Sequence, residues 1–139
     1  DQAAVDAALQ ACAMAPLRAR RMDEISGGEK ARAHIARALA QQAPLLMLDE
    51  PTAGLDPAQT LTVANILRQH AADGGGVLFS THDIALAAST AHRVVLLREG
   101  REIAAGAPDS ALTPAALEAA YGRVGELTRI GNTYVAVFR

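Results

Sequence analysis

Two short apolar runs on either side of a helix-like segment restrict the fold of this chain more than any other feature. Residues 45–50 read LLMLDE and residues 77–81 read VLFST, each too short for a helix and typical of a buried strand. Between them, Asp56-Pro57 is a typical helix N-terminus, and glycines follow at 74–76. Strand, crossover helix and strand predict a βαβ unit with a parallel sheet, which places the chain in the α/β class.

The flanking segments predict further helices and hairpins. Val5, Leu9 and Cys12 lie at helical spacing in residues 1–14, and Ile35 and Leu39 share the apolar face expected of a helix over residues 28–42. The remaining predictions are a short helix from Asp83, a hairpin turning at Glu99-Gly100, helices opening at Pro108 and Pro114, and a hairpin turning at Gly131-Asn132.

Composition narrows the class of protein. The chain has 139 residues, of which 50% are hydrophobic and 20% charged, which fits one folded domain or part of a larger one and excludes a disordered chain. Its net charge of −2 argues against nucleic acid as a partner. A lone cysteine, Cys12, excludes an internal disulfide and favours a reducing compartment. No apolar run approaches the roughly 18–20 residues that span a bilayer.

Two acids and an imidazole follow the predicted strands. Asp49 and Glu50 close the first run and His82 follows the second. Because ligands of parallel sheets bind at the carboxyl ends of strands, these side chains are candidates for one site. Mg²⁺ commonly takes one carboxylate plus phosphate oxygens, and a second carboxylate can deprotonate an attacking water. A plain acidic turn and a loop histidine remain alternatives.

Ser26-Gly27-Gly28-Glu29 opens the helix predicted over residues 28–42. Ser at the N-cap and Glu three residues later form a capping box. The same segment also fits an anion site, because free N–H groups at a glycine-rich helix N-terminus attract phosphate. Both interpretations stay open, as does a purely capping role for Asp56.

Taken together, these segments resemble the nucleotide-binding subunit of ABC transporters. ISGGEK is similar to the signature motif, LLMLDEP to Walker B, AGLD to the D-loop and STHD to the H-loop, in the family's order. The resemblance implies the C-terminal part of an ABC-type P-loop NTPase domain: a parallel sheet with flanking helices and a C-terminal hairpin. It assigns residues 1–30 to the end of the helical subdomain, 31–122 to a RecA-like core portion and 123–139 to the hairpin.

The chain departs from the family at its N-terminal side. No G-x-x-x-x-G-K-[ST] phosphate loop occurs in the sequence, and no Q-loop glutamine precedes the signature. We therefore expect the chain to be a fragment that begins within the helical subdomain and binds ATP weakly or not at all by itself.

The resemblance also implies roles in a complete, head-to-tail dimeric ATPase that uses ATP and Mg²⁺. It makes Asp49 the residue that holds Mg²⁺ through water, Glu50 the general base and His82 a contact to the γ-phosphate. The residues expected to act across the dimer, on the partner's ATP, are Ser26, Gly27, Gly28, Glu29 and Asp56.

Within the family, the second half of the chain is similar to importers of iron–siderophore complexes, haem and cobalamin. The segments HDIALAAS, RVVLLREGREIAAGAP and LTPAALEAAYG carry this similarity, which zinc and manganese importers partly share. The implied partners are a second ATP-binding subunit, membrane permease subunits and a substrate-binding protein. The implied location is the cytoplasmic face of the inner or plasma membrane.

Two alternatives belong to other functional classes. Heads of chromosome-maintenance or DNA-repair ATPases share Ser-Gly-Gly-Glu and Asp-Glu pairs, but they follow long coiled coils, and residues 1–14 show no sustained heptads. The other alternative is a non-catalytic half-module that pairs with a separate ATPase. Sequence upstream of Asp1 would separate all three.

Overall fold

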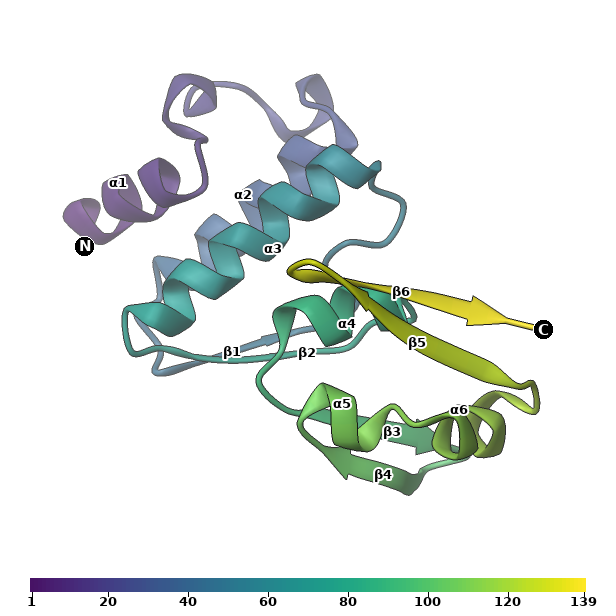
Figure 1. The fold of residues 1–139 in the computed structure, drawn as a ribbon. Coiled ribbons are helices and arrows are strands. Elements are labelled where there is room, and N and C mark those ends of the chain that lie inside the picture. The colour runs from purple at the N-terminus through teal and green to yellow at the C-terminus, as the bar shows by residue number, and fades with distance from the viewer. The chain divides into compact units, whose positions relative to one another are not determined.

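The computed structural model describes residues 1–139, which divide into two compact units, Asp1–Thr81 and His82–Arg139. The first unit, purple to teal in Figure 1, contains α1 (Gln2–Ala11), η1 (Ala15–Leu17), η2 (Met22–Glu24), α2 (Gly27–Leu39), β1 (Leu45–Leu48), α3 (Pro57–Ala72) and β2 (Gly76–Phe79). The second unit contains α4 (Ile84–Thr90), β3 (Val94–Arg98), β4 (Arg101–Gly106), α5 (Pro108–Ala111), α6 (Pro114–Tyr121), β5 (Gly125–Ile130) and β6 (Thr133–Phe138).

The first unit is built on the predicted βαβ arrangement. Strands β1 and β2 pair in parallel, with Leu46 opposite Val77 and Leu48 opposite Phe79. Helix α3 connects them and has Pro57 in its first turn, where the missing N–H of proline leaves no helical bond unmade. The parallel strand–helix–strand prediction is confirmed.

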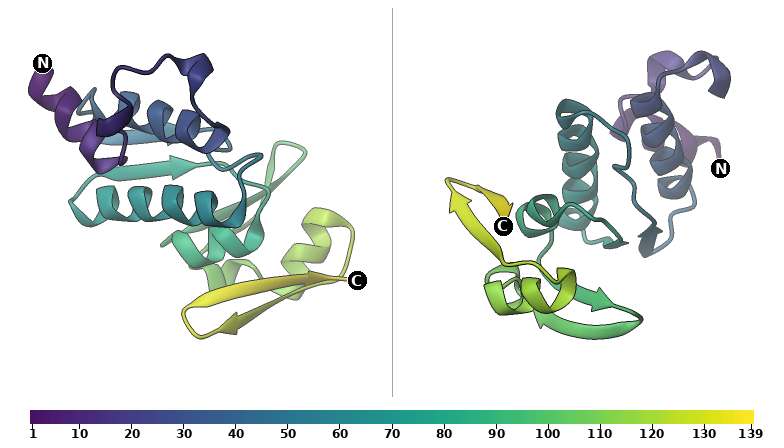
Figure 2. Two further views of the ribbon diagram at one scale, coloured as in Figure 1. Left: turned by 90° about the horizontal axis from the view of Figure 1, so that it is seen from above. Right: turned by 90° about the vertical axis from the view of Figure 1, so that its right-hand side faces the viewer.

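Helices α2 and α3 cover one face of the β1–β2 pair, as Figure 1 and the right-hand view of Figure 2 show. Side chains from that face pack against a buried cluster made of Ala8, Cys12, Met14, Ile35, Ala36, Val63 and Leu67. The opposite face is open: Met47 is 71% exposed and its neighbour across the pair, Leu78, 55%. The prediction of fully buried strands is therefore wrong, because within this unit helices lie on one side of the sheet only.

The exposed side of α1 and the C-terminal end of α2 differ from prediction. The apolar face predicted for α2 is confirmed, because Ile35 is buried and Leu39 packs against the same buried cluster. Helix α1 buries the small residues Ala4 and Ala8 and leaves Val5 38% exposed, because it packs closely against α2. Helix α2 ends at Leu39, three residues earlier than expected, and Gln42 in the following turn has a φ of +54°.

The second unit consists of two antiparallel hairpins held together by short helices. β3 pairs with β4 around Glu99-Gly100, and β5 pairs with β6 around the predicted Gly131-Asn132 turn. Both hairpin predictions are confirmed. The core of this unit is formed by Ile84, Ala88, Leu96, Leu112 and Leu117. The Tyr134 hydroxyl donates to Asp109 at 2.7 Å, which ties β6 to α5 and raises the pKa of the tyrosine.

Candidate functional site

The adjacent carboxylates Asp49 and Glu50 lie immediately beyond the carboxyl end of β1, and both are exposed. Glu50 has a φ of +44°, and its carbonyl accepts a hydrogen bond from the Ala53 N–H at 3.0 Å. A left-handed backbone destabilises a residue with a side chain by about 1–2 kcal/mol, so neighbouring contacts must hold Glu50 in this conformation.

Ser80, on the segment after β2, makes those contacts. Its backbone N–H donates to the Leu48 carbonyl at 3.0 Å and continues the parallel pairing past the end of both strands. Its hydroxyl accepts from the Glu50 N–H at 2.9 Å and donates to the Asp49 carboxylate. Sequence reasoning missed Ser80. The available signal was register: the residue after the second strand lies beside the residue after the first.

The N-terminus of α2 carries the predicted capping box. The Glu29 N–H donates to the Ser26 hydroxyl at 3.3 Å, and the Ser26 N–H donates to the Glu29 carboxylate at 2.7 Å. That second bond is the main reason the pKa of Glu29 lies below its usual value. Gly27 is exposed, and a Cβ added there would meet no atom within 4 Å. The helix end is therefore capped by its own side chains and remains open at Gly27.

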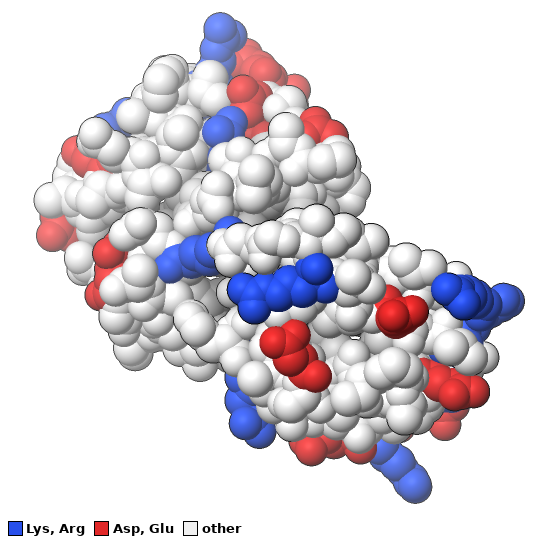
Figure 3. Space-filling view, in the orientation of Figure 1, with Lys and Arg blue, Asp and Glu red and all other residues white.

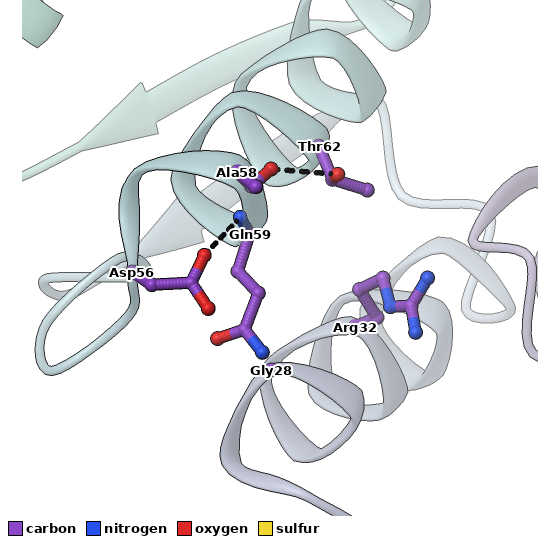
Figure 4. Close-up of a pocket in the computed structure, with 6 residues that line it drawn as sticks. All are labelled: Gly28, Arg32, Asp56, Ala58, Gln59 and Thr62. Carbon is purple, nitrogen blue, oxygen red and sulfur yellow. Dashed lines mark hydrogen bonds between the residues drawn. The ribbon is translucent and has the colours of Figure 1, made fainter.

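A small pocket joins the N-termini of α2 and α3 (Figure 4). Its volume is about 170 Å³, and it is lined by Gly28, Arg32, Asp56, Ala58, Gln59 and Thr62. The Asp56 carboxylate caps α3 by accepting from the Gln59 N–H at 2.8 Å. The Gln59 side-chain amide lies over Gly28, so two segments predicted from separate motifs meet in one pocket.

His82 opens the second unit, two residues after Ser80 along the chain, and it is exposed. The next residue, Asp83, caps α4 by accepting from the Leu86 N–H at 2.9 Å, which confirms the predicted helix start. The expected proximity of His82 to Glu50 stays a prediction.

The carboxylates of Asp49 and Glu50 are compatible with a magnesium ion that takes its remaining ligands from water and substrate. The structure contains no group of three or more His, Cys, Asp or Glu side chains placed to hold a metal. Mg²⁺ does not require such a group, because it keeps several waters and binds one or two carboxylates together with substrate phosphates. The exposed carboxylates of Asp49 and Glu50 meet that requirement.

Charged side chains of both signs are scattered among uncharged ones on the face drawn in Figure 3. No helix of the structure combines the length and the apolar character needed to cross a membrane.

Comparisons with known proteins agree with this geometry. The family model described as "ABC transporter" matches residues 1–53. Two relatives named "Hemin import ATP-binding protein HmuV" are 50% identical over 79% of this chain (Streptomyces coelicolor) and 46% identical over 88% (Pseudomonas putida). The "Cobalamin import ATP-binding protein BtuD" of Halobacterium salinarum is 42% identical over 87% of this chain. The chain spans 39%, 50% and 31% of the length of these three relatives.

Solved structures show the same fold. An ABC transporter in an inward-facing conformation superimposes with a TM-score of 0.86 at 26% identity, over 99% of this chain and 55% of that one. CbiO1 of Clostridium perfringens, part of the ABC transporter complex cbiONQ, gives a TM-score of 0.75 at 28% identity over 87% of this chain and 50% of its own.

The fold and the motifs are those of an ABC-type nucleotide-binding domain, and the chain is similar to the ATP-binding subunits of ABC transporters. It corresponds to the C-terminal part of that P-loop NTPase domain, as expected. Within the family its similarity is to the ATP-binding proteins of hemin and cobalamin importers. These relatives favour the transporter over the chromosome-maintenance alternative.

Proposed function

We propose that this chain is part of the ATP-binding and ATP-hydrolysing subunit of an ABC importer for a haem, iron–siderophore or cobalamin type of substrate. The observation that carries the proposal is the pair Asp49 and Glu50 at the carboxyl end of a parallel strand, exposed and held by a neighbouring hydroxyl. The names of the relatives support the importer assignment.

Asp49 and Glu50 take different parts in the proposed reaction. The Asp49 carboxylate would hold Mg²⁺ through water, and the ion would supply positive charge to offset the negative charge of the ATP phosphates. Glu50 acts as the general base, accepting a proton from the water that attacks the γ-phosphorus. His82 contacts the γ-phosphate and orients it. The exposed position of all three side chains is compatible with contact to a substrate.

The N-terminus of α2 serves a second ATP, bound mainly by another copy of the subunit. The Ser26 hydroxyl and the backbone N–H groups of Gly27 and Gly28 present hydrogen-bond donors to its terminal phosphate, a role that the open surface at Gly27 supports. Glu29 keeps the helix end in shape through the capping box, and Asp56 reaches the same interface from α3.

The proposed assembly is a head-to-tail dimer of ATP-binding subunits on the cytoplasmic face of the membrane, joined to permease subunits and served by a substrate-binding protein. In this assembly residues 1–30 belong to the helical subdomain, 31–122 to the RecA-like core portion and 123–139 to the C-terminal hairpin.

Glu50→Gln in the complete subunit tests the proposal. The amide keeps the size of the side chain but cannot accept the proton, so we expect ATP binding to persist and steady-state hydrolysis to fall by about 100-fold or more. Binding of a fluorescent ATP analogue and phosphate release are the measurements. Ser110→Ala, a hydroxyl deletion in α5, is the control and should hydrolyse ATP like the parent. Undiminished phosphate release from Glu50→Gln would reject the base assignment.

A further inference from the structure

We propose that Ser80 is a positioning residue for hydrolysis, which fixes the carboxylate of Asp49 and the backbone of Glu50 through one hydroxyl group. This inference rests on the proposed function, because it matters only if those two residues act on Mg²⁺ and on water.

The hydroxyl of Ser80 uses both of its hydrogen-bonding capacities on the two acids. A hydroxyl has one proton to donate and lone pairs to accept with. Here the proton goes to Asp49 Oδ1 and a lone pair receives the Glu50 N–H. One side chain on the β2 side therefore orients two consecutive residues on the β1 side.

The bond to Glu50 stabilises a backbone that is otherwise unfavourable. The backbone of Glu50 has a φ of +44°, so rotation to an ordinary conformation would lower its free energy. That rotation would also turn its carboxylate away from the site. Acceptance of the Glu50 N–H by Ser80 opposes the rotation. The general base thus depends on Ser80 for its direction.

The bond to Asp49 fixes the rotation of a metal-binding carboxylate. A hydrogen bond to a charged group is stronger than one between neutral groups, and groups that orient metal ligands in this way affect metal affinity and activity by about 10–100-fold. Ser80 engages Oδ1, and the carboxylate presents its other oxygen in a set direction.

A merely structural role is separable from this one. The parallel pairing at this point uses the Ser80 N–H and the Leu48 carbonyl, both of them backbone groups that any residue except proline supplies. Deleting the hydroxyl leaves this pairing intact. The Ser80 side chain is exposed, so a slightly larger residue fits.

The matched pair Ser80→Thr and Ser80→Val in the complete subunit tests the proposal, because the two residues have the same shape and differ by the hydroxyl. For Ser80→Val we expect kcat to fall about tenfold or more and the Mg²⁺ concentration for half-maximal hydrolysis to rise about tenfold, with little change in the KM for ATP at saturating Mg²⁺. Ser80→Thr should stay within about threefold of the parent on each quantity.

Further variants distinguish a failure of this inference from misfolding and from a failure of the proposed function. Ser80→Ala serves as the smaller hydroxyl deletion if the valine variant fails to fold, and Ser110→Ala in α5 is the control. In a Glu50→Gln background, Ser80→Val should add little further loss of kcat but still shift the Mg²⁺ dependence. Ser80→Val or Ser80→Ala with the parent's kcat and Mg²⁺ dependence would overturn the inference. Absence of hydrolysis by the parent, or full hydrolysis by Glu50→Gln, would reject the proposed function instead.

Discussion

The Gln59 side chain fills the space beside Gly28 where a larger residue would place its Cβ, at the pocket between the N-termini of α2 and α3. A Cβ added at Gly28 would lie 2.4 Å from the Gln59 Cδ, 2.7 Å from its Nε2 and 2.8 Å from its Oε1. The overlapping group is the end of a flexible side chain, so Gly28→Ala displaces an amide and not the backbone.

We predict energetic coupling between these two positions. Gly28→Ala alone gains up to about 1 kcal/mol of helix propensity and loses a similar amount to the displaced amide. In a Gln59→Ala background the clash is absent, and the same change should stabilise the protein. Urea unfolding of the two single variants and the double variant measures the coupling, expected at about 0.5–1 kcal/mol. Strictly additive free energies of unfolding would contradict the contact.

Burial raises the pKa of the Cys12 thiol from 9.0 to about 11, against a smaller opposing effect of Arg32. Folding therefore favours the protonated thiol. Below pH 9 the thiol is protonated whether the chain is folded or unfolded, so its contribution to stability is constant there. Between pH 9 and 11 the unfolded chain ionises first, and stability falls as pH rises.

Two measurements check this prediction. Cys12 should react with a thiol reagent at pH 8 far more slowly in the folded protein than in urea. The free energy of unfolding should decline from pH 9 upward, and Cys12→Ala should remove that part of the decline while lowering stability below pH 9, where the thiol is protonated in both states. Equal labelling rates with and without urea would show that the thiol is accessible.

Sequence found the charged members of the candidate site and missed the neutral one. Asp49 and Glu50 are recognisable in the sequence because two acidic residues directly after an apolar strand are uncommon. A single serine at the end of a strand carries no pattern. Its role depends on the strand register, which brings Ser80 next to residues about 30 positions away.

At the scale of elements, local signals predicted helix starts well. Asp56, Asp83 and Thr113 each accept an N–H three residues later, as short polar N-cap residues do. Which side of a helix or strand is buried was predicted less well. The exposure of Val5 and Met47 depends on which elements pack against them, and periodicity in one segment does not contain that information.

The turn between β3 and β4 offers a stabilising substitution. Glu99 and Gly100 both have positive φ, 52° and 73°, as a two-residue type I′ hairpin requires. Asparagine tolerates this conformation better than glutamate, so Glu99→Asn should stabilise the protein by about 0.5–1 kcal/mol, read from the thermal midpoint.

Glu99→Gln is the control for that substitution. It removes the same charge, and with it the exposed 3.8 Å contact to Arg98, but brings no preference for positive φ. Equal gains from asparagine and glutamine would assign the effect to charge and not to the backbone.

At the scale of the whole molecule, the chain contains only some of the groups that the proposed nucleotide site requires. The carboxylates and the signature segment are present, whereas no phosphate-loop sequence occurs among the 139 residues. We predict that calorimetric titration of this chain alone with Mg-ATP gives little heat, because the lysine and backbone cradle for the β- and γ-phosphates are missing. The complete subunit, titrated in parallel, should bind. Micromolar binding by this chain alone would contradict the expectation and indicate a different nucleotide site.

The open face of β1 and β2 determines what a saturation mutagenesis scan of this chain would report. Met47 and Leu78 already meet water, so replacing them with serine removes little buried apolar area and leaves the free energy of unfolding almost unchanged. If another part of an ATP-binding subunit packs against this face, the same replacements would bury polar hydroxyl groups in an apolar interface and weaken the association. Both positions would then tolerate serine in a measurement of the stability of this chain and be sensitive to serine in a measurement of cellular fitness.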